Sequence, residues 1–242
     1  MLTERILLGK FSEDQLDSIL SRSSRTGDVG ERIAYLSEQF LGVGYGESTL
    51  IGSRDMPEVF VISLSMVDCF TLLEYVEALR RAESFSQFRE NLRKVRYKSG
   101  EVVFTSRNHF FTDWPVHNGD SVTDVTREIG DFRDVAVQKR LNEKGDGTRY
   151  LNGIEPFSRR IRYIPSEAID ETIISRMETG DYIGIYSHSP GLDVSHTGIL
   201  VKKDDGVFLR HASSQEQHRK VVDQEFSIYI ADRPGIVVLR PK

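Results

Sequence analysis

One cysteine, Cys69, is the side chain in this sequence with the clearest capacity for nucleophilic chemistry. Apolar residues recur every three to four positions after it, at Leu72, Leu73, Val76 and Leu79, so we expect a helix that begins at about Cys69. In the first turn of a helix, unpaired backbone N–H groups and the positive end of the dipole favour a thiolate over a thiol. The alternative is a small buried hydrophobic residue, because free cysteine is among the most buried residue types.

A nucleophilic cysteine needs a base, and the base needs a group that orients it. His196 stands at the start of the apolar run 197–201, and His211 ends the next apolar run, 207–211. If these runs form a hairpin that turns about residues 204–206, the two histidines lie nearly opposite each other. Directly opposed side chains on neighbouring strands are about 5 Å apart, which lets one imidazole hold the other.

Two further histidines, His109 and His117, flank Trp114 in a segment that mixes aromatic rings with polar groups. This segment fits a loop anchored by its aromatic side chains and a ligand-recognition element equally well. A single cysteine excludes an internal disulfide and any multi-cysteine metal site, and neither a His-Glu-x-x-His motif nor a close histidine pair occurs. We therefore expect no metal site.

Helices are the first elements expected along the chain, and they must help to position these residues. Helical spacing predicts two helices within the first forty residues, and a short apolar strand is expected at 59–62. The helix from Cys69 is expected to be amphipathic, with Glu74, Glu77 and Arg80 on its polar side. Another helix within 80–98 should present its basic residues to solvent.

The last third of the chain carries short β-type runs joined by turn residues, which implies antiparallel neighbours. Helices that precede strands predict an α+β domain rather than alternating βαβ units. Residues 101–163 are polar and irregular, so we expect them to cover a site rather than to form the core. The predicted strands include residues 182–186, 197–201, 207–211 and 236–239.

Composition limits the classes of partner. The 242 residues carry 32 basic and 37 acidic side chains, a formal net charge of −5, so no global field favours nucleic acid or an anionic membrane. The sequence lacks an apolar run of the roughly 18 to 20 residues that cross a bilayer, and residues 1–10 lack an apolar segment of signal-peptide length. A cytoplasmic protein and an exported one whose leader has been removed both fit these observations.

Four blocks of sequence carry these candidate residues in a fixed order. They are Phe40-Leu41-Gly42-Val43-Gly44-Tyr45 with Thr49-Leu50; Asp68-Cys69-Phe70-Thr71 with Glu74 and Ala78-Leu79; Arg107-Asn108-His109-Phe110-Phe111-Thr112-Asp113-Trp114; and Gly180-Asp181 through Asp193-Val194-Ser195-His196-Thr197-Gly198-Ile199 to His211-Ala212-Ser213-Ser214. Together the blocks span about residues 40–225. In this order the sequence resembles the NlpC/P60 superfamily of papain-like cysteine hydrolases, and within it the DUF1460, or N-acetylmuramoyl-L-alanine amidase-like, family.

The resemblance implies an α+β, papain-like NlpC/P60 fold. In that fold N-terminal helices, with the nucleophilic cysteine at a helix N-terminus, pack on a C-terminal antiparallel β-sheet. It also implies one catalytic domain over residues 1–242, with N-terminal helices in 1–41 and a family-specific insertion at about 99–165.

The resemblance also implies roles, position by position. Cys69 corresponds to the nucleophile, His196 to the general base, His211 to the residue that orients it, and Tyr45 to the group that polarises the carbonyl. The chain departs from the family at Gly44, where a proline usually precedes the tyrosine. The residues assigned to substrate binding are Asp68, Arg107, His109, Asp113, Trp114 and Ser213.

The implied reaction is hydrolysis of the amide between N-acetylmuramic acid and L-alanine in peptidoglycan fragments, with a preference for 1,6-anhydro-muropeptides and without a cofactor. Two alternatives stand beside it: a stem-peptide endopeptidase of the γ-D-glutamyl-diamino acid type, and a non-catalytic muropeptide-binding protein. We expect a bacterial monomer in the periplasm, in the cell envelope or outside the cell, with its leader removed, and a cytoplasmic location stays open.

Overall fold

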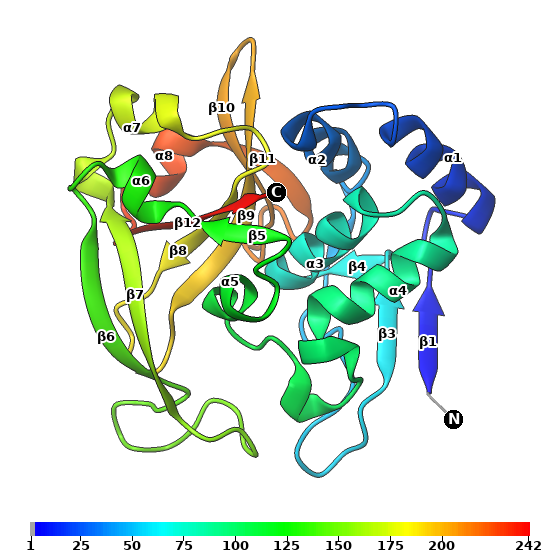
Figure 1. Ribbon diagram of the computed structural model, residues 1–242, viewed down its shortest axis with the longest axis horizontal. Coiled ribbons are helices and arrows are strands. Elements are labelled where there is room, and N and C mark those ends of the chain that lie inside the picture. Colours follow the sequence, from blue (N-terminus) through cyan, green and yellow to red (C-terminus); the bar gives the residue numbers. More distant parts are fainter. Residues whose placement is uncertain (1–2) are drawn as a thin grey trace.

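Helices gather around α3 in the first half of the chain, as Figure 1 shows. The structure is a computed structural model that describes residues 3–242. Ser12, Asp28 and Ser84 cap three of the helices, since each side-chain oxygen accepts a backbone N–H of the first turn. The elements of this half are β1 (Glu4–Leu7), α1 (Glu13–Ser23), α2 (Val29–Glu38), β2 (Gly44–Tyr45), β3 (Phe60–Ser63), β4 (Met66–Val67), α3 (Cys69–Arg80), α4 (Phe85–Arg96) and α5 (Trp114–His117). The two helices predicted before residue 41, the strand near 59–62 and the helix within 80–98 are confirmed.

An antiparallel sheet fills the second half. Its strands follow the order β11-β10-β9-β8-β12-β7-β6, and β5 pairs with β12 beside this path. The elements are β5 (Val122–Asp124), α6 (Thr126–Gly130), β6 (Val135–Leu141), β7 (Phe157–Pro165), α7 (Glu171–Arg176), β8 (Tyr182–Tyr186), β9 (Val194–Lys203), β10 (Gly206–Ala212), β11 (Val221–Glu225), α8 (Phe226–Ile230) and β12 (Gly235–Pro241). Each of the four predicted runs lies in a strand, so the mixture of helices with an antiparallel sheet agrees with the expected α+β class.

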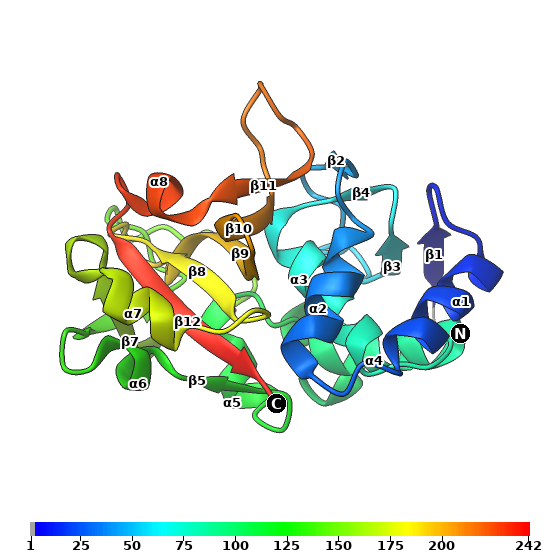
Figure 2. The same ribbon diagram turned by 90° about the horizontal axis from the view of Figure 1, so that it is seen from above.

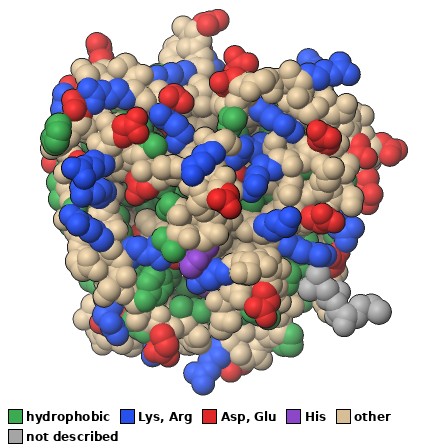
Figure 3. Space-filling view, in the orientation of Figure 1, with side chains coloured by type: hydrophobic (Ala, Val, Ile, Leu, Met, Phe, Trp, Pro, Cys, Tyr) green, Lys and Arg blue, Asp and Glu red, His purple; other side chains and the backbone are tan. Residues whose placement is uncertain are grey.

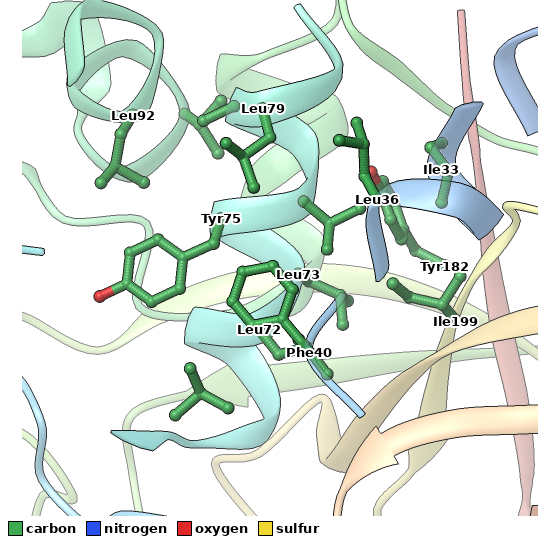
Figure 4. Packing of buried hydrophobic residues seen from close by; sticks show 14 of the residues in the cluster. Ile33, Leu36, Phe40, Leu72, Leu73, Tyr75, Leu79, Leu92, Tyr182 and Ile199 are labelled. Atoms are coloured by element: carbon green, nitrogen blue, oxygen red, sulfur yellow. The ribbon is translucent and has the colours of Figure 1, made fainter. Parts of the chain in front are cut away.

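The helices and the sheet lie side by side, with α2 and α3 bordering β9 and β10 (Figure 2). Apolar side chains from α2, α3 and this face of the sheet form the larger core, where Leu36, Leu73, Tyr182 and Ile199 meet (Figure 4). The opposite face of the sheet packs on α6, α7 and α8 in a second core that contains Leu200. Alternation along β9 therefore sends neighbouring residues into two different cores.

The helix that begins at Cys69 is buried on every side, so the expectation of a polar face was wrong. Glu74, Glu77 and Arg80 are all buried. Arg80 Nε lies 2.6 Å from Glu77 Oε2, and Arg96 Nε of α4 lies 2.6 Å from Glu74 Oε2. Arg96 is fully buried rather than presented to solvent. Because each charge is paired with one of opposite sign, these side chains can be buried even though helical periodicity alone would assign them to the surface.

Strands β5, β6 and β7 lie in the region predicted to be irregular. β6 and β7 pair over their whole facing lengths, and β7 joins the sheet through Ile164, which pairs with Ile236 of β12. β6 is an edge strand and most of its residues are not buried, so its sequence carries charged side chains. Lys and Arg side chains gather on this side of the molecule (Figure 3). In and near β6 and β7, Arg133, Arg140 and Arg162 pair with nearby carboxylates.

We predict that the buried Glu74–Arg96 pair is needed to hold α3 against α4. Arg96→Leu leaves the Glu74 carboxylate buried without a partner and should lower the free energy of unfolding by about 3–5 kcal/mol. The double variant Glu74→Leu/Arg96→Leu should lose clearly less. Arg89→Leu removes a partly exposed arginine from the same helix and should lose under about 1 kcal/mol. Urea unfolding measures all three, and equal losses for Arg96→Leu and Arg89→Leu would contradict the prediction.

Candidate active site

Cys69 occupies the first position of α3, where Asp68 caps the helix. Asp68 Oδ1 accepts hydrogen bonds from the backbone N–H groups of Phe70, at 3.0 Å, and Thr71, at 2.8 Å. The Thr71 hydroxyl in turn accepts the Asp68 N–H at 2.9 Å, which completes a capping box. Thr197 of β9 donates its hydroxyl to the Cys69 carbonyl at 2.8 Å. Hydrogen bonds from the helix cap and from the sheet thus fix the backbone that carries the half-buried Cys69.

Burial in this environment favours the protonated thiol over the thiolate that a helix N-terminus would favour. Burial and, to a smaller extent, the neighbouring Asp68 carboxylate together raise the pKa of Cys69 to about 11. Burial also lowers the pKa of His196 to about 3. Because the penalty for burying a charge exceeds the effect of the dipole, the resting site holds a thiol and a neutral imidazole.

The two predicted histidines are hydrogen-bonded to each other. His196 Nε2 on β9 lies 2.7 Å from His211 Nδ1 on β10, and the ring planes are nearly perpendicular at 87°. Arg210 pairs with Ile199, so His211 sits beside Gly198 and reaches His196 diagonally rather than directly across the strands. The predicted pairing of the rings is therefore confirmed, with a register displaced by two residues.

Cys69 and His196 line the same cavity, of about 220 Å³. Its walls are mainly apolar, and they come from the start of α3, from the segment 109–111 and from the loop before β9. The apolar and aromatic lining residues include Phe70, Phe110, Phe111, Tyr150, Leu151, Leu192 and Val194. An apolar enclosure around a thiol and an imidazole keeps water away from charges that develop during a reaction.

A second, more polar cavity of about 570 Å³ adjoins the first, because Tyr150 and Leu151 line both. Asp68 and Arg107 face this second cavity. A third cavity, of about 650 Å³, shares Arg54 with the second. Shared lining residues therefore place the three cavities next to one another, with the apolar cavity at Cys69 at one end of the series.

Tyr45 is held near Cys69 by pairing of the short strands β2 and β4. Its N–H donates to the Arg219 carbonyl at 2.9 Å, and the Arg219 guanidinium lies 5.3 Å from the centre of its ring. Burial raises the pKa of Tyr45, and negative charge on Cys69, once formed, or on Asp68 acts in the same direction, so the phenol keeps its proton. Backbone pairing fixes Tyr45 even though Gly44 replaces the usual proline.

Besides Asp68, two of the predicted binding residues line these cavities. Arg107 lines the second cavity, and its Nε and Nη2 bind the two oxygens of Glu58 at 2.6 and 2.7 Å. His109 lines the first cavity, with Nε2 2.8 Å from the Phe104 carbonyl. Burial lowers the pKa of His109 to about 4, so this ring is neutral near pH 7.

Three other predicted binding residues lie behind the walls. Asp113 is buried and pairs with Arg159 at 2.8 Å, and Trp114 packs its ring on Phe70 at a centroid distance of 5.3 Å. Ser213 is also buried and accepts the Gln215 N–H at 3.4 Å. None of the three lines the cavity that holds Cys69. Their polar or aromatic types suggested contact with a ligand, but their placement favours support of the lining residues instead.

Sequence reasoning missed three residues that touch this site. Thr197 binds the Cys69 carbonyl, Gln224 Oε1 lies 2.6 Å from His211 Nε2, and the Tyr229 ring lies 5.0 Å from that of His211. Thr197 directly follows His196 and could have been found from its place on the strand. Gln224 and Tyr229 carried no such signal, because strand β11 and helix α8 were not predicted.

The described part of the chain contains neither a candidate metal centre nor a candidate membrane-spanning helix. Within residues 3–242, no three or more His, Cys, Asp or Glu side chains are grouped so that they could hold a metal ion. None of the helices in that range combines the length and apolar character that crossing a membrane requires.

Comparisons with known proteins agree with this architecture. A family model described as N-acetylmuramoyl-L-alanine amidase-like matches residues 35–236. The chain is similar to the crystal structure of a Legionella pneumophila protein of the DUF1460 family model, with a TM-score of 0.79 and 23% identity over 95% of this chain and 94% of that one.

Structures of an N-acetylmuramoyl-L-alanine amidase from Bacteroides uniformis are also similar. One has a TM-score of 0.72 and 29% identity, and it covers 89% of this chain and 100% of its own. Another has a TM-score of 0.70 and 30% identity with the same coverage. No curated protein matches the sequence.

The protonated resting thiol predicts an unusual pH dependence of alkylation. The rate at which iodoacetamide modifies Cys69 should rise about tenfold for each pH unit between 7 and 9, because the thiolate fraction grows in that proportion below the pKa. Asp68→Asn keeps the helix cap but removes the charge, so it should raise the rate at pH 8. Mass spectrometry follows the reaction at the only cysteine in the chain.

A rate that is already constant above about pH 5 would show a thiolate–imidazolium pair and contradict this prediction. An unchanged thermal midpoint of Asp68→Asn serves as the control for folding.

Proposed function

Because the chain belongs to the N-acetylmuramoyl-L-alanine amidase-like family, we propose that it is a cysteine amidase that releases L-alanine-linked peptides from N-acetylmuramic acid in peptidoglycan fragments. The observation that carries the proposal is the shared cavity of Cys69 and His196, with His211 hydrogen-bonded behind His196. The start of α3 at Cys69 and the antiparallel strand β9 beside it support a papain-like arrangement of the NlpC/P60 type. A nucleophile, a base and an orienting group in this order define a hydrolase of the cysteine class.

In the proposed reaction the Cys69 sulfur attacks the carbonyl carbon of the lactyl group while its proton passes to His196. The neutral states of the thiol and of the imidazole allow this transfer to accompany the attack. His196 then gives the proton to the nitrogen of L-alanine, the C–N bond breaks, and a thioester remains on Cys69. A water molecule attacks the thioester with His196 as base, which releases the sugar carboxylate and restores the thiol.

Two groups are placed to stabilise the oxyanion formed in each step. The backbone N–H of Cys69 lies in the first turn of α3 and is free of an intrahelical partner. Tyr45 keeps its hydroxyl proton, and it lies close enough to Cys69 that negative charge on the sulfur would raise its pKa. Preorganised donors of this kind lower the barrier because they need no rearrangement as charge develops.

The two adjoining cavities suit a fragment whose reacting amide enters the apolar cavity while a more polar part of the fragment occupies the second cavity. The apolar cavity at Cys69 encloses the scissile amide, while the polar cavity with Asp68 and Arg107 receives the charged or hydroxyl-bearing part of the ligand. We propose soluble 1,6-anhydro-muropeptides as the substrates and action in the cell envelope, where such fragments arise.

The substrate is tested by incubating purified GlcNAc-anhydro-MurNAc-peptides with the protein and analysing the products by mass spectrometry. We expect a free peptide that begins with L-alanine with the wild type and none with Cys69→Ser. Cys69→Ser should remain folded, because it exchanges one atom at a half-buried position. Cleavage within the stem peptide would replace the amidase by an endopeptidase, and an unchanged ligand that still binds would indicate a binding protein.

The assigned roles predict unequal effects of the two histidines. His196→Ala should retain almost no turnover, because no other group takes the thiol proton. His211→Ala should retain a measurable fraction, since it removes only the group that orients the base. Steady-state rates on the same muropeptide measure both, and equal rates would contradict the assignment.

A further inference from the structure

Gln224 extends the hydrogen-bonded histidine pair across a third strand. Its Oε1 on β11 lies 2.6 Å from His211 Nε2 on β10, and His211 Nδ1 lies 2.7 Å from His196 Nε2 on β9. Leu209 is the residue that pairs with Gln224, so the contact with His211 is diagonal, as is the contact between the histidines. Three side chains on adjacent strands thus form one continuous chain of hydrogen bonds.

The chemistry of these groups fixes where the protons lie. A carboxamide oxygen only accepts, so His211 Nε2 must carry a hydrogen. A neutral imidazole carries one N–H, so His211 Nδ1 accepts and His196 Nε2 must donate to it. The remaining nitrogen of His196, Nδ1, then keeps its lone pair.

Both rings are neutral near pH 7, as this deduction requires. Burial lowers the pKa of His196 to about 3 and that of His211 to about 4. The Arg233 charge contributes to both low values and His218 contributes to that of His211, whereas the Gln224 hydrogen bond and Asp223 oppose the lowering at His211. Tyr229 covers the rings from α8. Of these neighbours, only Gln224 accepts a hydrogen bond from the His211 ring within the described residues 3–242.

We propose that Gln224 is a positioning residue that sets the tautomer of both histidines and so leaves Nδ1 of His196 as the base for the Cys69 thiol. This inference rests on the proposed cysteine amidase activity only for its kinetic consequence. The tautomers themselves can be observed without any substrate.

The first test is the ¹⁵N–¹H correlation spectrum of protein labelled at histidine, recorded near neutral pH and assigned with single His→Gln variants. We expect the Nε2–H tautomer for both His196 and His211. Gln224→Glu offers only acceptor atoms and should keep both tautomers, whereas Gln224→Lys offers only donors and should move the proton of His196 to Nδ1. Nδ1–H on His196 in the wild type, or the same tautomers in Gln224→Lys as in the wild type, would overturn the proposal.

The second test uses kinetics on the GlcNAc-anhydro-MurNAc-peptide. Gln224→Met has a similar size but no polar group, and we expect kcat to fall at least about tenfold while KM stays unchanged. Gln224→Glu should keep kcat near neutral pH and shift the acid limb of the pH profile upward, because its charge favours the imidazolium. Gln217→Met is the matched control, because Gln217 is an exposed glutamine that lines a cavity of about 510 Å³ together with Gln224. This variant should leave kcat, KM and the pH profile unchanged.

The two tests separate failure of the inference from failure of the proposed activity. If the wild type does not cleave the muropeptide, the amidase proposal fails, and the spectra still decide the role of Gln224. If the wild type is active but Gln224→Met keeps full kcat with an unchanged spectrum, the inference fails alone. Thermal midpoints of all variants show whether any loss of kcat reflects unfolding.

Discussion

The hydrogen bond from the Thr197 hydroxyl to the Cys69 carbonyl joins the two halves of the molecule at the site itself. One partner belongs to the first turn of α3, the central helix of the first half, and the other to β9, a central strand of the sheet. His196 precedes Thr197, so the same short piece of strand that binds the helix also carries the proposed base. The distance between nucleophile and base therefore depends on packing between helix and sheet, and both elements are buried in the larger core.

Desolvation dominates the electrostatics around this junction. The same burial that raises the pKa of Cys69 lowers those of His109, His196 and His211, so a site containing many ionisable groups rests with few charges. Charges do occur deeper in α3, but each is matched by a partner of opposite sign, as with Glu77 and Arg80. The paired charges hold the helix in place, while the unpaired reactive groups stay neutral until a substrate arrives.

Sequence reasoning located the elements with strong periodicity and the residues they carry. The repeat after Cys69 placed the start of α3, and the two apolar runs with a turn between them brought His196 and His211 together. Strands β6 and β11 were not predicted, because they lie at the edges of the sheet and carry polar residues that hide the apolar alternation of a strand. The burial of Glu74 and Arg96 was not predicted either, because the two residues are distant in sequence and no local pattern indicates that they pair. Gln224 could not be identified as a neighbour of His211 without the position of β11.

The diagonal contacts explain how one face of a sheet can hold a chain of three polar side chains. Diagonal neighbours on adjacent strands are about 7–8 Å apart, which is still within reach of aromatic and long side chains, so a two-residue offset allows each ring to meet the next group. Gly198, beside His211, is required by this arrangement: a Cβ there would approach Leu209 Cδ1 to 2.7 Å and the Arg210 carbonyl oxygen to 3.0 Å. The hydrogen-bonded chain from His196 to Gln224 is thus set by strand register rather than by a loop. Its geometry is consequently present before any ligand binds, as preorganised catalysis requires.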